Sequence, residues 1–180
     1  MPNLIAIGGI PAVGKTTIIK QFFYNYKNWK SFKFKKLYGH YNEQLNLIIL
    51  GKYIDNELFS GTDKLSMAVQ PDFEEFIDKE KPPYNILFEG DRLFNIKTLQ
   101  KVKDKMTLQV YIVTSNNTIQ RHINRNDSQS EKFIKGRVTK TNNIKSYLAD
   151  NYITLINNKE TDIQKNFKII IDNYNNFRGI

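Results

Sequence analysis

The chain has 180 residues, a length typical of one domain with its own buried core, and we expect a single domain over residues 1–180. It contains no cysteine, which excludes disulfides, cysteine-based zinc sites and thiol catalysis and suits a reducing cytoplasm. Its formal net charge of +9 favours polyanionic partners such as nucleic acids, with a lysine-rich solvated surface as the alternative. No apolar run approaches membrane-spanning length, so we expect a soluble cytoplasmic protein with no membrane partner.

The N-terminal stretch predicts a strand, a glycine-bounded loop and a helix. An apolar run at residues 4–7 precedes Gly-Ile-Pro-Ala-Val-Gly-Lys-Thr at residues 9–16, which matches the phosphate-loop pattern G-x-x-x-x-G-K-[S/T]. Glycines let several backbone N–H groups converge on a phosphate, and the helix adds the positive end of its dipole. Lys15 is expected to reach the β- and γ-phosphates, and Thr16 to hold Mg²⁺. The residues expected to bind ATP are Gly9, Ala12, Val13, Gly14, Lys15, Thr16 and Thr17.

A basic, aromatic segment follows the helix predicted over residues 15–26. Residues 20–42 contain six lysines, nine aromatic residues and no acid. One interpretation is a nucleic-acid surface on which rings such as Trp29 and Tyr38 stack on bases. The other places Phe32 and Phe34 in the core and the lysines on the solvated face, and we favour it for most of these residues. Strand-like runs at 31–38 and 45–53 predict a β-hairpin with its turn at residues 39–44.

A polar segment without clear periodicity occupies residues 59–71. Loops of this size in compact domains are often functional. The segment therefore supplies the candidate substrate-binding residues Asp63, Lys64, Ser66 and Gln70. The alternative is a short helix that Thr62 or Asp63 caps and Pro71 stops.

The second informative stretch is an apolar strand at residues 84–88 that ends in Glu-Gly-Asp-Arg, after a helix that starts near Asp72 and ends before Pro82. Open α/β sheets bind ligands at the carboxyl ends of their strands. We therefore expect Glu89 or Asp91 to serve Mg²⁺ through water, or to accept a proton from an attacking hydroxyl. Arg92 is expected to bind a phosphate in a bidentate manner. A salt bridge within the loop is the alternative.

A further helix and strand, near residues 96–106 and 108–113, lead into a basic helical segment at about 116–140. We expect this segment to form a lid, with Gly136 as a candidate hinge. Its arginines Arg121, Arg125 and Arg137 would stabilise the charge on a transferred phosphoryl group. A solvated pair of basic helices is the alternative. A helix near 144–149, a strand near 152–158 and a helix capped by Thr161 or Asp162 complete the chain.

This order of elements predicts an α/β fold of the P-loop NTPase kinase type. We expect a mostly parallel central sheet flanked by helices, with a β-hairpin insertion and a basic helical lid. A GTPase is disfavoured, because residues 158–161 read Asn-Lys-Glu-Thr where guanine recognition requires Asn-Lys-x-Asp. A small kinase fits the length and the basic segment best.

The loop at 9–16, Asp91-Arg92 after a strand, and the three arginines in the lid position resemble the thymidylate-kinase-like branch of P-loop kinases. This resemblance spans most of the chain and implies that the Asp-Arg pair serves the metal and the phosphate of the acceptor. More narrowly, residues 61–71, 129–131 and 135–140 resemble phage P-loop kinases associated with thymine hypermodification. Members of that group phosphorylate the hydroxymethyl of hydroxymethyluracil already in DNA. The resemblance implies a phage-encoded protein that acts in the host cytoplasm on DNA containing a modified base, with ATP and Mg²⁺ as cofactors.

Three functions remain open at this point. The first is ATP-dependent phosphorylation of 5-hydroxymethyluracil in DNA. The nucleobase would be flipped out of the duplex, and the Lys20-to-Tyr41 stretch would follow the DNA backbone. Asp91 or, less favoured, Asp63 would accept the proton of the hydroxyl. The second is a deoxynucleoside monophosphate kinase, in which Arg92 holds the acceptor's own phosphate but the positive charge is unexplained. The third is a nucleotide-gated nucleic-acid-binding module, against which Lys15, Thr16, Asp91 and the lid arginines together argue. The oligomeric state does not follow from the sequence.

Overall fold

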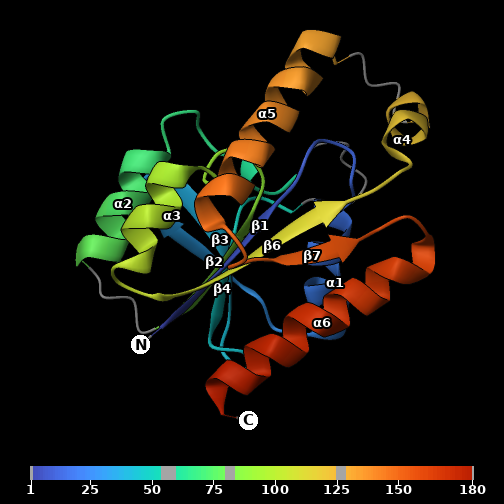
Figure 1. The fold of residues 1–180 in the computed structure, drawn as a ribbon. Helices are drawn as coiled ribbons and strands as arrows, with labels where there is room; N and C mark the ends of the chain where they lie inside the picture. Colours follow the sequence, from blue (N-terminus) through green and yellow to red (C-terminus); the bar gives the residue numbers. More distant parts are fainter. Residues whose placement is uncertain (1, 54–59, 80–83, 125–128, 180) are drawn as a thin grey trace.

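The computed structural model describes residues 2–53, 60–79, 84–124 and 129–179, and shows an α/β arrangement with helices on both faces of a central sheet (Figure 1). Its seven strands lie in the order β2-β3-β4-β5-β1-β6-β7. Strands β4, β5, β1, β6 and β7 pair in parallel, whereas β2 and β3 form an antiparallel edge. The strands are β1 (Asn3–Gly8), β2 (Lys30–Phe34), β3 (Leu37–Asn42), β4 (Leu47–Leu50), β5 (Asn85–Glu89), β6 (Thr107–Thr114) and β7 (Ile153–Ile156). The prediction of a mostly parallel sheet flanked by helices is confirmed.

The helices cover the sheet in two groups that follow from the strand pattern. They are α1 (Lys15–Asn25), α2 (Gln70–Lys79), α3 (Ile96–Lys103), α4 (Thr118–Asn124), α5 (Glu131–Leu148) and α6 (Glu160–Arg178), with a 3₁₀ turn η1 (Thr62–Lys64). Alternate residues of β1 belong to the two hydrophobic cores on opposite faces of the sheet. Leu4 packs with side chains of α2, α3 and α5, and Ile5 packs with side chains of α1 and α6. Burial on both faces explains why β1 reads as a continuous apolar run. Among the described helices, none is long and apolar enough to cross a membrane.

The predicted hairpin is a three-stranded unit, and its predicted turn was wrong. Gly39, which suggested a turn, lies within β3 and pairs with Phe32 of β2 and Leu50 of β4. A Cβ at this position would clash with the carbonyl oxygen of Ile49, so the glycine permits close strand packing rather than a bend. The chain reverses instead at residues 35–36 and 43–46, where Lys35 and Asn46 have positive φ angles of 51° and 50°.

The aromatic residues of the basic segment mostly belong to the core, as favoured. Phe32 and Phe34 both pack against Phe76 of α2, with ring centroids 5.3 Å apart in each case. Trp29 packs against Phe23 at 4.7 Å. Because these rings contact other rings, they offer little free face for stacking on bases.

Two helix boundaries differ from those predicted. Pro71 does not stop a helix but lies in the first turn of α2, where its missing N–H is tolerated. Gly136 is not a hinge between helices, because α5 runs without a break through residues 131–148 and includes the separate helix predicted near 144–149. Ser130 starts α5 by accepting a hydrogen bond from the N–H of Phe133.

Candidate functional site

The loop at residues 9–16 connects the carboxyl end of β1 to α1, as predicted, and has an unusual backbone. Gly9, Ala12 and Gly14 have positive φ angles of 134°, 60° and 93°. A side chain at Gly14 would overlap the amide of Asn157, so this position requires glycine for space as well as for conformation. The ammonium of Lys15 folds over the loop and donates to the carbonyls of Gly9 and Ile10, at 2.9 Å each.

The outer side of this loop is braced by two residues from other elements. Asn157, directly after β7, donates its amide to the carbonyl of Val13 at 2.7 Å. Arg121 of α4 donates to the carbonyls of Ala12 and Asn157, at 3.3 and 2.9 Å. The structure therefore places Arg121 against the back of the loop and not in the cavity where the transferred group was expected, because the loop carbonyls attract its guanidinium.

Glu89 lies beside the loop because β5 pairs in parallel with β1, which aligns Glu89 with Ile7. Thr16 donates its hydroxyl to Oε1 of Glu89 at 3.0 Å. Glu89 is only 3% exposed. Burial, assisted by the charges of Asp63 and Asp91 and opposed by Lys15 and the Thr16 hydrogen bond, raises the pKa of Glu89 to about 7.

A turn from outside the sheet covers this carboxyl. Thr62 of η1 donates its hydroxyl to the backbone carbonyl of Glu89, and Gly61 lies so close to Glu89 Oε1 that a Cβ would overlap it. The same turn carries Asp63, whose carboxyl opens into the cavity. The surrounding protein raises the pKa of Asp63 by burial, and Asp91 adds to the effect while Lys15 opposes it. Thr62 and Asp63 were predicted as possible helix caps, and they lie instead within a short 3₁₀ turn.

Asp91 contacts the basic helix α5. Its carboxylate pairs with Arg137 at 2.9 Å and with Lys140 at 3.2 Å, and Lys140 also donates to the backbone carbonyl of Asp91 at 3.0 Å. Arg92 lies half-buried nearby, and its Nε is buried without a hydrogen-bond partner in the described structure. Asp91 is thus held by two cations, whereas Glu89 takes the position beside Thr16 that we predicted for either acid.

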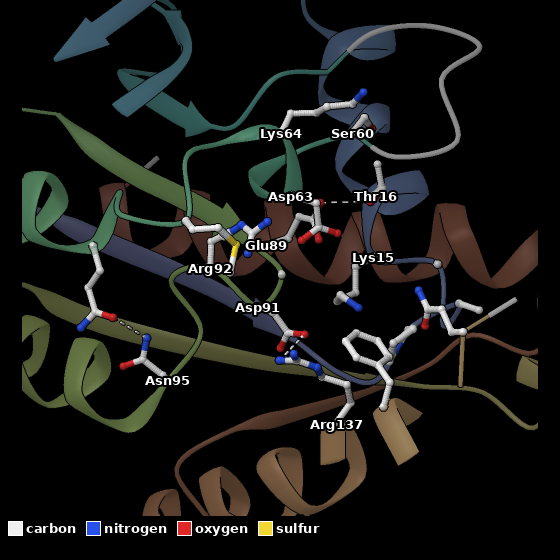
Figure 2. Close-up of a pocket in the computed structure, with 18 residues that line it drawn as sticks. Lys15, Thr16, Ser60, Asp63, Lys64, Glu89, Asp91, Arg92, Asn95 and Arg137 are labelled. Atoms are coloured by element: carbon white, nitrogen blue, oxygen red, sulfur yellow. Dashed lines mark hydrogen bonds and ion pairs between the residues drawn. The ribbon is translucent and has the colours of Figure 1, made fainter. Parts of the chain in front are cut away.

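These groups surround one cavity of about 950 Å³ at the carboxyl ends of β1 and β5. Figure 2 shows Lys15, Asp63, Glu89, Asp91 and Arg137 converging on it from four different segments. The predicted site residues that line it are Ala12, Gly14, Lys15, Thr16, Asp63, Lys64, Gln70, Glu89, Asp91, Arg92 and Arg137.

Other predicted residues lie elsewhere. Ser66 accepts a hydrogen bond from the N–H of Ala68 and stabilises a local turn. Gly9, Val13 and Thr17 shape the loop and the start of α1 without lining the cavity. Arg125 falls outside the described residues.

Several lining residues were missed by sequence reasoning, among them Ser60, Met67, Asn95 and Phe133. Asn95 had a usable signal, since an Asn directly before an apolar helical pattern is a typical N-cap, and its side chain accepts from the N–H of Thr98. Its amide also donates to Gln70 at 3.2 Å, which joins α3 to α2 at the cavity wall. Met67 and Phe133 had no such signal, because exposed apolar residues are common on protein surfaces.

The donor set suits a hard cation. No group of three or more acidic, histidine or cysteine side chains suited to a metal occurs among the described residues. Mg²⁺ commonly uses one or two protein ligands and completes its coordination with water and substrate phosphates. The Thr16 hydroxyl and the Glu89 carboxylate are oxygen donors of this kind. Comparison with protein-family models and with curated proteins gives no match for this chain.

Proposed function

We propose that this chain is a P-loop kinase that transfers the γ-phosphoryl group of ATP to a hydroxyl acceptor. The observation that carries the proposal is the convergence of Lys15, Thr16 and three carboxylates with Arg92 and Arg137 on one cavity. Phosphoryl transfer needs cations around the phosphates, an oxygen-rich metal position and a carboxylate near the acceptor. A phosphate-binding regulatory module would need the loop and the lysine but not the acids opposite them.

The triphosphate would bind at the 9–16 loop. The backbone N–H groups at the start of α1 would contact its oxygens, and Lys15 would exchange the carbonyls of Gly9 and Ile10 for phosphate. Thr16 and Glu89 would hold Mg²⁺, which neutralises charge on the β- and γ-phosphates. Asp91, the other acid expected to bind the metal, is less suited to this role because Arg137 and Lys140 already neutralise it.

In the transfer step, the oxygen of the acceptor hydroxyl attacks the γ-phosphorus as the bond to the β-bridging oxygen breaks. The hydroxyl proton passes to a carboxylate, and the geometry favours Asp63 for this role over Asp91. Asp63 and Lys15 line the same cavity, and Asp63 is not held by the Arg137 and Lys140 contacts that bind Asp91. The pKa of the Asp63 carboxyl is raised, which strengthens it as a proton acceptor. Arg92 and Arg137 would stabilise the charge on the transferred group.

For the acceptor we propose the hydroxymethyl group of 5-hydroxymethyluracil in DNA. Beyond the acids, the cavity is lined by the amides of Gln70 and Asn95 and by the apolar side chains of Met67 and Phe133, a combination that suits one pyrimidine nucleotide. The net charge of +9 supports a polyanionic substrate. Arg92 supports the second candidate, a deoxynucleoside monophosphate kinase. Its guanidinium is half-buried, and its Nε has no hydrogen-bond partner among the residues that the structure describes, an arrangement that suits a terminal phosphate.

The test is transfer of labelled γ-phosphate from ATP with Mg²⁺. Hydroxymethyluracil-containing DNA, unmodified DNA of the same sequence and free deoxynucleoside monophosphates are offered in parallel. Label on the modified DNA alone supports the DNA kinase, and label on the monophosphates alone supports the second candidate. Absence of label from every acceptor, with ATP binding retained, would overturn the kinase proposal.

A further inference from the structure

We propose that a groove between the start of α3 and the middle of α5 binds the backbone of the nucleic-acid strand that continues from the acceptor nucleotide. This inference rests on the proposed function and specifies how a polymeric substrate would leave the cavity. The groove is a second cavity of about 420 Å³, lined by Asn95, Ile96 and Lys97 from one side and by Gly136, Thr139 and Lys140 from the other.

The groove adjoins the main cavity. Asn95 lines both of them. Lys140 lines the groove, and its ammonium contacts Asp91, which lines the main cavity. A nucleotide bound with its base near Gln70 and Phe133 therefore has this groove beside it, where the next phosphodiester could bind. A free mononucleotide would leave this groove unused.

The charge of the groove suits phosphodiesters. Two of its lining residues, Lys97 and Lys140, are cations, of which Lys140 is paired with Asp91 of the main cavity, and no acid lines the groove within the described part of the chain. The Lys97 side chain is 74% exposed although it pairs with Glu74 at 3.3 Å, so a strand phosphate can reach it. The helix α5 carries five basic residues, Lys132, Lys135, Arg137, Lys140 and Lys145, and one acid, Glu131.

The groove wall is also sterically open. A Cβ at Gly136 would meet no heavy atom within 4 Å, and Thr139 and Asn143 beside it offer hydrogen-bonding side chains without bulk. The open wall allows a sharp test, because a side chain introduced at Gly136 would project into free space without disturbing the core.

The experiment compares Gly136→Glu with Gly136→Gln, which has nearly the same shape and no charge. Each variant is assayed on a single-stranded oligonucleotide with one 5-hydroxymethyluracil and on 5-hydroxymethyl-dUMP, which has the same base without flanks. We expect Gly136→Glu to lower kcat/KM for the oligonucleotide at least tenfold relative to Gly136→Gln, and to change the value for 5-hydroxymethyl-dUMP less than twofold. The control Asn176→Glu adds the same charge on α6, across the sheet, and should affect neither acceptor.

Binding separates failure of this inference from failure of the kinase proposal. Fluorescence anisotropy of the same oligonucleotide needs no transfer activity. We expect Gly136→Glu to weaken binding at least fivefold relative to Gly136→Gln. Lys97→Gln should reduce the slope of the logarithm of the binding constant against the logarithm of the salt concentration by about one, as for the loss of one phosphate contact. Lys103→Gln, on the last turn of α3, should leave this slope unchanged. Equal binding by the Gly136 variants, or no oligonucleotide binding by the unsubstituted protein at low salt, would overturn the groove assignment whatever the kinase assay shows.

Discussion

Arg137 of α5 forms an ion pair with Asp91 at the end of β5, with 2.9 Å between the guanidinium and the carboxylate. Lys140, nearly one turn later in the helix, binds the same carboxylate at 3.2 Å. The two contacts hold the basic helix over the cavity, as Figure 2 shows for Arg137. They also bind the carboxylate of Asp91, which was the preferred base because it lies at a strand end. Asp63 is left facing the cavity.

The first prediction tests whether Asp63, and not Asp91, accepts the proton of the acceptor hydroxyl. Asp63→Asn should lower kcat by about two to four orders of magnitude, because it removes the proposed proton acceptor. Asp91→Asn should lower kcat by less than about tenfold, since it loosens α5 without removing that group. Both values come from initial rates at saturating ATP. If Asp91→Asn has the larger effect, Asp91 is the base and the pairing with Arg137 must break during the reaction.

The stability contribution of the Asp91–Arg137 pair should be small. Both side chains are about one-third exposed, so solvent screens their attraction. A double-mutant cycle with Asp91→Asn and Arg137→Gln should give a coupling energy of about 0.5–1 kcal/mol in urea unfolding, and less at high salt. A coupling energy well above this range would show that the pair is effectively buried and that it holds α5 rigidly against the rest of the protein.

Glu89 should make the stability of the protein depend on pH. Its pKa is raised from 4.5 to about 7, so between these values the folded state binds a proton that the unfolded state releases. Stability should therefore fall as pH rises through this window, by up to about 3 kcal/mol. Glu89→Gln should remove much of the decrease and raise the free energy of unfolding at pH 8 by about 1–3 kcal/mol without Mg²⁺ or nucleotide.

The measurement for Glu89 is urea unfolding of both proteins at pH 5 and pH 8. Glu43→Gln is the matched control, because Glu43 is exposed and pairs with an exposed lysine, Lys30, at 3.0 Å. It should change the free energy of unfolding little and equally at both pH values. An equal loss of stability for Glu89→Gln at both pH values would show that Glu89 is ionised and stabilising in the folded state.

Lys15→Ala should strongly reduce phosphoryl transfer while leaving the fold intact. The Lys15 ammonium donates to two loop carbonyls beside the cavity, so replacing it should leave the packing of the core unchanged. We expect kcat/KM to fall by about two to three orders of magnitude, as for loss of one strong electrostatic contact in the transition state. Lys168→Ala, on the outer face of α6, is the control. Near-normal turnover by Lys15→Ala would contradict the assignment of the 9–16 loop as the triphosphate site.

Predictions from the sequence were correct where a local residue pattern has one structural cause. An apolar run that ends at glycine predicted both the 9–16 loop and Glu89 at the end of β5, and the alternation of strands and helices predicted the parallel sheet. The structure has all three as expected. The predictions of a turn at Gly39 and of a hinge at Gly136 were wrong, because glycine also permits close strand packing and occurs on exposed helix faces. Residue spacing alone does not distinguish these uses from turns and hinges.

The remaining parts of the site depend on tertiary packing. Nothing local indicated that Arg121 would brace the loop with Asn157, 36 residues further along the chain. Nor did the sequence show that Lys140 would bind Asp91, because the orientation of α5 over the cavity is set by the burial of Ile144 and Leu148 against the sheet. Side chains from distant segments meet only once these helices are packed.

Gly61 and Gly136 make a matched pair for the last prediction. Gly61 has φ 78° and ψ −143°, a region that other residues almost never adopt, and a Cβ there would overlap the Glu89 carboxylate. Gly61→Ala should therefore destabilise the protein by about 2–4 kcal/mol and displace Glu89 from Thr16. Gly136→Ala should instead stabilise it by up to about 1 kcal/mol, because Gly136 is exposed within α5 and alanine favours helix. Urea unfolding of the two variants gives the comparison, and similar effects of both would mean that the turn at Gly61 relaxes away from Glu89 at little cost.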